Sequence, residues 1–189
     1  MRINKTILAA VAGASLLAAQ SAFAQQPSET TETYGNWTYR CSQVVVLPAA
    51  NSSDDKIADT ADASSKKVCE TVQSLQNADG NVIAQIAFGL DPVAPEKVIA
   101  VFQVPQGTLL SSPVRFGNED LTDAIDAAYF TCIQSICLAR AESSIEALAK
   151  YGTFEKGSLG FADRSGRQIN VLMSFDGFSA AIKRLSSDK

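Results

Sequence analysis

Residues 68–90 decide the fold class of this chain, and they read VCETVQSLQNADGNVIAQIAFGL. Two runs with apolar and β-branched residues, Val68–Gln76 and Val82–Leu90, flank a polar segment that contains Asp79-Gly80. An Asp-Gly pair between two such runs is a strong signal for a β-hairpin. The stretch therefore predicts two antiparallel strands joined by a short turn.

A further strand is predicted before this hairpin. Trp37, Tyr39 and Cys41 alternate with polar residues, which is the period-two pattern of a half-buried strand. We expect the two rings and the thiol to point inward, so Trp37 is expected in the core rather than on a contact surface. Residues 44–47 continue the strand character, and Pro48 ends it because proline cannot donate a backbone hydrogen bond to a sheet.

Short strands are also predicted after the hairpin. One face of the run 98–104 carries Val98, Ala100, Phe102 and Val104. Other apolar pieces, separated by turn residues, lie at 108–110, 114–116, 129–132, 137–141, 158–162 and 168–175. Many short strands with turns between them are typical of an antiparallel all-β domain. We therefore predict a mainly β, single antiparallel β-sandwich-like domain over residues 34–189.

Two short helices are predicted near the C-terminal end. The first begins after Ser143 or Ser144, has Glu146 in its first turn and is followed by Gly152. The second is expected to begin with Asp176 as its N-cap. Its apolar stripe consists of Phe178, Ala181, Ile182 and Leu185.

The first 24 residues have the pattern of a secretory signal peptide. Arg2 and Lys5 precede an apolar run from 7 to 19, and Ala22-Phe23-Ala24 follows it as a small-residue cleavage site. The apolar run is shorter than the roughly 20 residues that a membrane-spanning helix needs. We expect cleavage after Ala24 and a mature protein in the periplasm or outside the cell. Residues 25–33 are polar and are expected to form a flexible leader.

Charge and composition exclude several classes of function. The 189-residue chain carries a net charge of −4, and without residues 1–24 the remaining 165 residues carry −6. Basic residues stand singly or in pairs, so a nucleic-acid interface is not expected. The chain contains no histidine, which excludes His-based catalytic triads and His metal ligands.

All four cysteines follow the predicted signal peptide: Cys41, Cys69, Cys132 and Cys137. An exported chain meets oxidising surroundings, which favour disulfides, and four cysteines allow three pairings. Cys132 and Cys137 are close enough for a local bridge across a turn, which leaves Cys41 with Cys69. A four-cysteine zinc site is the alternative, but zinc ribbons usually show two close pairs and this chain has one. No metal or other cofactor is therefore predicted.

Residues 48–65 are predicted to form a low-complexity loop. The segment is rich in Ala, Ser and Asp and offers little apolar surface to bury. A bridge between Cys41 and Cys69 would tie this long insertion at its base, which makes it tolerable in a compact domain.

Several segments match a family pattern when they are taken in order. They are Gly35-Asn36-Trp37 followed by Cys41, then Val104-Pro105-Gln106-Gly107, then Cys132 and Cys137, and finally Gly177-Phe178 before a C-terminal helix. In this order the chain resembles the invasion-associated locus B family of exported bacterial proteins. The chain departs from the family at Ile136, where a glycine is frequent, and in its longer loop between the first two cysteines. The resemblance implies a secreted or periplasmic β-rich domain, linked in some pathogens to host-cell invasion, and it carries over no catalytic residue.

The sequence favours a binding or envelope-interaction protein over an enzyme, with a protein or envelope component of unknown identity as its partner. No binding residues can be assigned from the pattern. The first alternative is a small carboxylate-dependent hydrolase of envelope glycan, since two acids can cleave a glycosidic bond without histidine. Its candidates are Glu119, Asp120, Asp123 and Asp126. The three aspartates are spaced to share one face of a short helix, but a plain solvated acidic face is the favoured interpretation. A periplasmic chaperone or inhibitor is the other alternative.

Overall fold

The computed structural model describes residues 30–46 and 64–188. The predicted signal peptide, residues 25–29 of the predicted leader and most of the predicted loop lie outside these residues. The strands are β1 (Thr30–Tyr34), β2 (Trp37–Val46), β3 (Ser64–Gln76), β4 (Val82–Leu90), β5 (Lys97–Pro105), β6 (Val114–Asn118), β7 (Ala124–Ile133), β8 (Ile136–Ser144), β9 (Lys156–Ala162) and β10 (Gln168–Ser174). The helices are α1 (Ile145–Ala149), a 3₁₀ turn η1 (Lys150–Thr153) and α2 (Phe178–Ser186).

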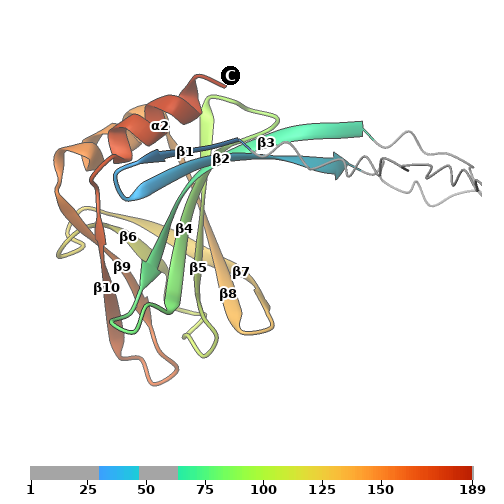
Figure 1. Cartoon of the computed structure of the whole chain (residues 1–189). Coiled ribbons are helices and arrows are strands. Elements are labelled where there is room, and N and C mark those ends of the chain that lie inside the picture. Colours follow the sequence, from blue (N-terminus) through green and yellow to red (C-terminus); the bar gives the residue numbers. More distant parts are fainter. Residues whose placement is uncertain (1–29, 47–63, 189) are drawn as a thin grey trace, which may run out of the picture.

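The ten strands form one antiparallel sheet in the order β1-β2-β3-β4-β5-β8-β7-β6-β9-β10. The sheet curves over a common core, so that the Phe88 ring of β4 lies 5.3 Å from the Phe116 ring of β6. The Phe102 ring of β5 lies 5.7 Å from the same ring. Figure 1 shows α2 lying across one end of the strands, and β2 and β3 extending away from the others. The predicted mainly antiparallel β fold with two short helices is confirmed.

The strands predicted from alternation bury the side chains that the pattern assigned to the core. Trp37 and Tyr39 are 0% exposed and Cys41 is 1% exposed. The hairpin of β3 and β4 turns at residues 77–81, where the Gly80 amide donates to the carbonyl oxygen of Asn77. On β5 the predicted face of Val98, Ala100, Phe102 and Val104 is buried.

Both predicted disulfides are present. Cys41 bonds to Cys69, and the two residues are direct partners in the register of β2 and β3. Cys132 bonds to Cys137, and these are partners across the β7–β8 hairpin. In both pairs the Cα atoms are 4.0 Å apart, so each bridge ties two strands that already pair through their backbones.

Two glycines of the family pattern, far apart in the sequence, meet at the end covered by α2. Gly35 lies in the turn between β1 and β2 with a φ of 54°, and Gly177 lies before α2 with a φ of 82°. The Asn36 amide donates to the carbonyl oxygen of Asp176 at 3.1 Å. A Cβ atom on Gly177 would stand 1.9 Å from the carbonyl oxygen of Tyr34. Only glycine allows the two turns to approach so closely.

The predicted start of α1 is confirmed, whereas the predicted start of α2 is wrong by one residue. The Ser144 side chain accepts a hydrogen bond from the amide of Ala147, as an N-cap does. The N-cap of α2 is Gly177, which makes no side-chain cap, and not Asp176. The carbonyl oxygen of Asp176 accepts a hydrogen bond from the Asn36 amide in the β1–β2 turn. The chain then enters α2 through Gly177, which has a left-handed backbone conformation. The apolar stripe of α2 is buried as predicted.

Two boundaries differ from the expectation. Thr30–Thr33 belongs to β1 and pairs with β2, although we expected residues 25–33 to be a flexible leader. Ser64 and Ser65 belong to β3 and pair with Val46 and Val45, although they were assigned to the loop. Residues 30–33, 64 and 65 are all polar, so they belong to the sheet through backbone pairing, without an apolar pattern that the sequence could reveal.

Candidate binding site

A hollow of about 990 Å³ lies between β3 and β10, and we call it the β3–β10 groove. Its residues are Asn36, Gln73, Ser74, Leu75, Gln76, Gly152, Phe154, Glu155, Lys156, Leu172, Met173, Ser174, Phe175, Asp176, Gly177, Ser179 and Ala180. These two strands begin and end the eight-strand series of the sheet from β3 to β10. No described strand pairs with both of them, so the curved sheet is open at this position.

The groove exists because β2 does not run along the whole of β3. The pairing of β2 with β3 ends at the partners Thr38 and Val72. Beyond this point residues 73–76 pair with β4 on one side, and no described strand pairs with their other side. The second half of β3 is therefore the first wall of the groove.

The second wall is the outer edge of β10. The Phe175 amide, just after β10, donates to the carbonyl oxygen of Glu155 at 3.0 Å. In the register of β9 and β10, the odd-numbered residues of β10 are therefore the ones that form hydrogen bonds with β9. In an antiparallel pair the alternate residues direct their backbone groups away from the partner strand. Asn170, Leu172 and Ser174 therefore direct their N–H and C=O groups toward the outer edge.

The contacts of Ser174 agree with this orientation. Its carbonyl oxygen accepts hydrogen bonds from Trp37 Nε1 at 3.0 Å and from Gln73 Nε2 at 2.9 Å. Trp37 and Gln73 thus fasten the end of β10 to β2 and β3. Nearer the middle of β10, no described strand pairs with the outer side of Leu172 or Asn170.

Gln73 is an unusual residue for an inward position. Its side chain is only 5% exposed, and its Oε1 atom has no hydrogen-bond partner among the described residues. A buried acceptor without a partner costs about 1–3 kcal/mol. The groove therefore contains a polar atom that an incoming N–H group would satisfy. A glutamine at an inward position between Thr71 and Leu75 was the sequence signal for this residue, and the sequence analysis missed it.

A second hollow of about 720 Å³ continues the groove toward the β6–β7 turn. It shares Phe154, Glu155 and Lys156 with the first hollow and adds Asn118, Glu119 and Asp120. The charged residues of the two hollows are Glu119, Asp120, Glu155 and Asp176 against Lys156. The combined surface is therefore acidic.

The structure separates the four acids proposed for a hydrolase. Glu119 and Asp120 lie in the turn between β6 and β7 and line the second hollow. Asp123 lies in the same turn and forms an ion pair with Lys150. Asp126 lies on β7 and pairs with Arg115 at 3.1 Å.

The three aspartates therefore do not share a helix face, as the hydrolase alternative would require. The Asn118 side-chain oxygen accepts the amide hydrogen of Asp123, and Leu121 has a φ of 58°, so the segment is a closed turn. Hydrogen bonds from the Thr122 hydroxyl and amide hold the pKa of Asp120 below its usual range. A general acid needs a raised pKa, so Asp120 is not poised for that role.

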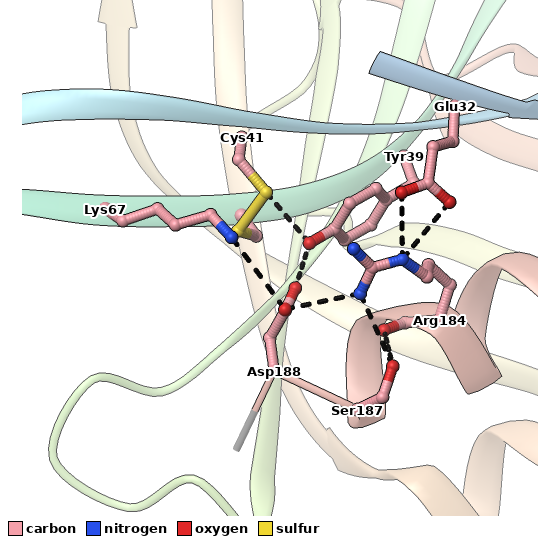
Figure 2. The surroundings of a disulfide bond; sticks show 8 residues. Glu32, Tyr39, Cys41, Lys67, Arg184, Ser187 and Asp188 are labelled. Atoms are coloured by element: carbon pink, nitrogen blue, oxygen red, sulfur yellow. Dashed lines mark hydrogen bonds and ion pairs between the residues drawn. A yellow bond between two sulfur atoms is a disulfide. The ribbon is translucent and has the colours of Figure 1, made fainter. Parts of the chain in front are cut away.

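A second polar cluster surrounds the Cys41–Cys69 disulfide (Figure 2). The Tyr39 hydroxyl lies 2.8 Å from Cys41 Sγ and donates to the carboxylate of Asp188. The pKa of Asp188 is raised, chiefly because burial disfavours its charged form. Lys67 lies 3.9 Å from the same carboxylate.

Arg184 connects this cluster to β1. Its guanidinium stands over the Tyr39 ring, 4.3 Å from the ring centre, and Nε lies 3.0 Å from Glu32 Oε1. Hydrogen bonds from the Tyr34 hydroxyl and from Arg184 lower the pKa of Glu32. The cluster joins β1, β2, β3 and the end of α2, as Figure 2 shows, so its evident role is to brace the fold.

The described residues contain one group with the composition of a metal site. Sulfur atoms of Cys41 and Cys69 and a carboxylate oxygen of Asp188 lie within 4.8 Å of one another. Both sulfurs are joined in the disulfide, so they provide no thiolate to a metal ion. The group therefore does not make a metal centre in this oxidised form.

The described part of the chain has no helix with the length and apolar character required to cross a membrane.

Comparisons with known proteins agree with the fold. A family model described as "Invasion associated locus B (IalB) protein" matches residues 55–186. The "Invasion protein B" of Bartonella bacilliformis is 25% identical over 175 residues, which cover 85% of this chain and 76% of that protein. The crystal structure of invasion associated protein b from Bartonella henselae superposes with a TM-score of 0.60 at 22% identity. That match covers 84% of this chain and 95% of the other and shows that the two have the same fold.

Proposed function

Because this chain belongs to the Invasion associated locus B family, we propose that it is an exported binding protein rather than an enzyme. Its partner is a protein or an envelope component, met in the periplasm or outside the cell. The relative from Bartonella bacilliformis is named an invasion protein. For this chain we propose only the binding step, in which it contacts a partner on a cell or envelope surface. Host-cell invasion and envelope maintenance are the two settings in which such contact would act.

The observation that carries this proposal is the β3–β10 groove. It is an open concave surface bounded by two strand edges, and it stands beside a core braced by a disulfide and a buried aromatic cluster. Recognition sites are commonly concave and carried by rigid scaffolds. Export is supported by the signal-peptide pattern and by two disulfides, which persist in oxidising compartments.

Site-directed photo-crosslinking tests the binding proposal. A photoreactive residue replaces Leu172, which lines the groove and is 63% exposed, and the exported protein is irradiated with bacterial envelope and host-cell membrane fractions. The control has the same residue at Val93, which is 90% exposed and outside the groove. We expect a discrete adduct from Leu172 and none from Val93. No adduct from Leu172 in either fraction would contradict the proposal.

The hydrolase remains the second candidate, and one observation favours it: Glu119, Asp120 and Glu155 line the same hollow. Glycosidases use two carboxyl groups that flank the bond to be cleaved. Release of reducing ends from purified envelope glycan measures this activity directly. Release that disappears in Glu119→Gln or Glu155→Gln variants would replace the binding proposal with an enzymatic one.

A further inference from the structure

We propose that the β3–β10 groove binds an extended peptide segment of a partner protein, which adds to the free edge of β10 as a further strand and carries basic side chains beside an apolar one. This inference rests on the proposed binding function and names the partner class for the same groove.

The backbone of β10 offers a template for a strand. The N–H and C=O groups of Asn170 and Leu172 have no described strand beside them. The backbone groups of the odd-numbered residues of β10 pair with β9 instead. An extended peptide that pairs with such an edge gains main-chain hydrogen bonds, and adjacent pockets then select its side chains. Proteins usually protect a free edge with charges, proline or a covering segment. The outer residues here are Asn170 and Leu172, which have no charge.

An apolar contact and a polar contact are available beside this edge. Leu172 is 63% exposed and lines the groove. An apolar side chain that packs on it would remove its apolar surface from water, which favours binding. Across the groove lies Gln73, whose buried Oε1 atom has no partner among the described residues. A donor from the bound segment would satisfy this acceptor.

The charge of the groove selects a basic partner. Glu119, Asp120, Glu155 and Asp176 outnumber the one basic residue, Lys156, over the two connected hollows. Charged groups on a surface attract opposite charge over about 8–10 Å at moderate salt. A segment with lysine or arginine beside an apolar residue therefore fits the surface.

Charge argues against segments of this chain as the occupant. Residues 48–63 contain Asp54, Asp55, Asp59 and Asp62 against Lys56. The chain as a whole is acidic, with a net charge of −4. A basic segment of a different protein matches the groove better than the acidic segment or a second copy.

Binding of synthetic peptides to the purified exported protein tests the proposal. The probe is a fluorescent peptide of alternating lysine and valine, and its charge control alternates glutamate and valine. We expect the basic peptide to bind about tenfold or more tightly than the acidic one at low salt, with the difference shrinking as salt is added. Equal binding of the two peptides would overturn the charge argument.

Proline substitution tests strand addition itself. The Leu172 N–H faces away from β9, so Leu172→Pro removes an outer donor and leaves the β9 pairing intact. The matched control, Leu172→Ala, shortens the side chain and keeps the donor. We expect Leu172→Pro to abolish peptide binding and Leu172→Ala to weaken it only a few-fold. Equal losses in the two variants would show that the contact is made by side chains and would overturn strand addition.

Hydrogen exchange keeps the test valid if Leu172→Pro does not fold. In the unaltered protein, the bound basic peptide must slow exchange of the Leu172 and Asn170 amide hydrogens, and unchanged exchange on binding would overturn the proposal. Failure of the strand-addition proposal is distinguishable from failure of the proposed binding function. A photo-crosslinked partner at Leu172 without amide protection leaves the binding function standing and removes only strand addition.

Discussion

The two halves of β3 have different surroundings. Residues 64–72 pair with β2, and the Cys41–Cys69 disulfide fastens this half to β2. From β2, the Tyr39 hydroxyl donates to Asp188, just beyond the end of α2. Residues 73–76 have β4 on one side only, and their other side forms a wall of the groove. One strand thus has a closed half that contributes to stability and an open half that is available for binding.

Trp37→Ala is expected to destabilise the protein by about 3–5 kcal/mol, as removal of a large buried ring usually does. The Trp37 ring is fully buried, lies 4.9 Å from the Phe178 ring and donates to the end of β10. Urea unfolding measures the free energy of unfolding. The control on the open side is Leu172→Ala, which should change it by less than about 0.5 kcal/mol because Leu172 is exposed. Similar costs for the two variants would contradict the assignment of Trp37 to the core and of Leu172 to an exposed edge.

Replacing Cys41 and Cys69 together by alanine is expected to cost about 3.6 kcal/mol, on the loop-entropy model for a loop of roughly 29 residues. The Cys132–Cys137 disulfide closes a much shorter loop, so the same replacement there should cost only about 2 kcal/mol. Denaturant unfolding of the two double variants measures the difference. A larger loss from the Cys132–Cys137 pair would show that the closed half of β3 is not the main brace.

Amide substitutions at Glu119, Asp120, Asp123 and Asp126 should separate groove acids from paired acids. Glu119→Gln and Asp120→Asn are expected to weaken binding of the basic peptide a few-fold, because both line the groove surface. Asp126→Asn is the matched control, since its ion pair with Arg115 lies outside the groove. Fluorescence anisotropy at two salt concentrations measures the affinities. A variant that folds but has lost all biological activity would instead favour the hydrolase.

Glu32→Gln should make the stability of the fold less sensitive to acid. The pKa of Glu32 is lowered from the usual 4.5 by hydrogen bonds from Tyr34 and Arg184. A lowered pKa in the folded state means that the carboxylate stabilises the fold above its unfolded pKa, and this contribution is lost as the pH falls through the folded pKa. The stability difference between the protein and the variant should therefore be largest near neutral pH and shrink below about pH 4.5. A difference independent of pH would contradict the assignment.

Deleting Asn51–Ala63 is expected to have the smallest effect on stability. The segment offers little apolar surface, and the entropy of loop closure changes slowly with loop length. The melting temperature should fall by less than about 4 °C, which corresponds to roughly 1 kcal/mol in a domain of this size. If the deletion preserved stability but removed crosslinking at Leu172, binding would depend on this segment as well as on the groove.

Much of the fold was predictable because burial alternates locally along each strand. The alternation of Trp37, Tyr39 and Cys41 identified the inner face of β2, and the apolar stripe of α2 was equally clear. Strand β1 is not predictable in this way, because Thr30–Thr33 are polar and show no apolar alternation. The hydrogen-bonded turn that holds Glu119 and Asp120 could not be predicted, because the spacing of its acids does not distinguish a closed turn from other exposed conformations.

The fold class, the positions of most strands, the favoured cysteine pairing and the resemblance to the family can be predicted from the sequence alone. These depend on local periodicity, on turn residues and on cysteine spacing. Only the tertiary structure decided that β5 pairs with β8, that Gly35 meets Gly177, and that β3 and β10 stand apart as the walls of a groove. Contacts such as that of Trp37 with Ser174 join positions far apart in the chain. No local pattern encodes such contacts, because they depend on how all the strands pack together around one core.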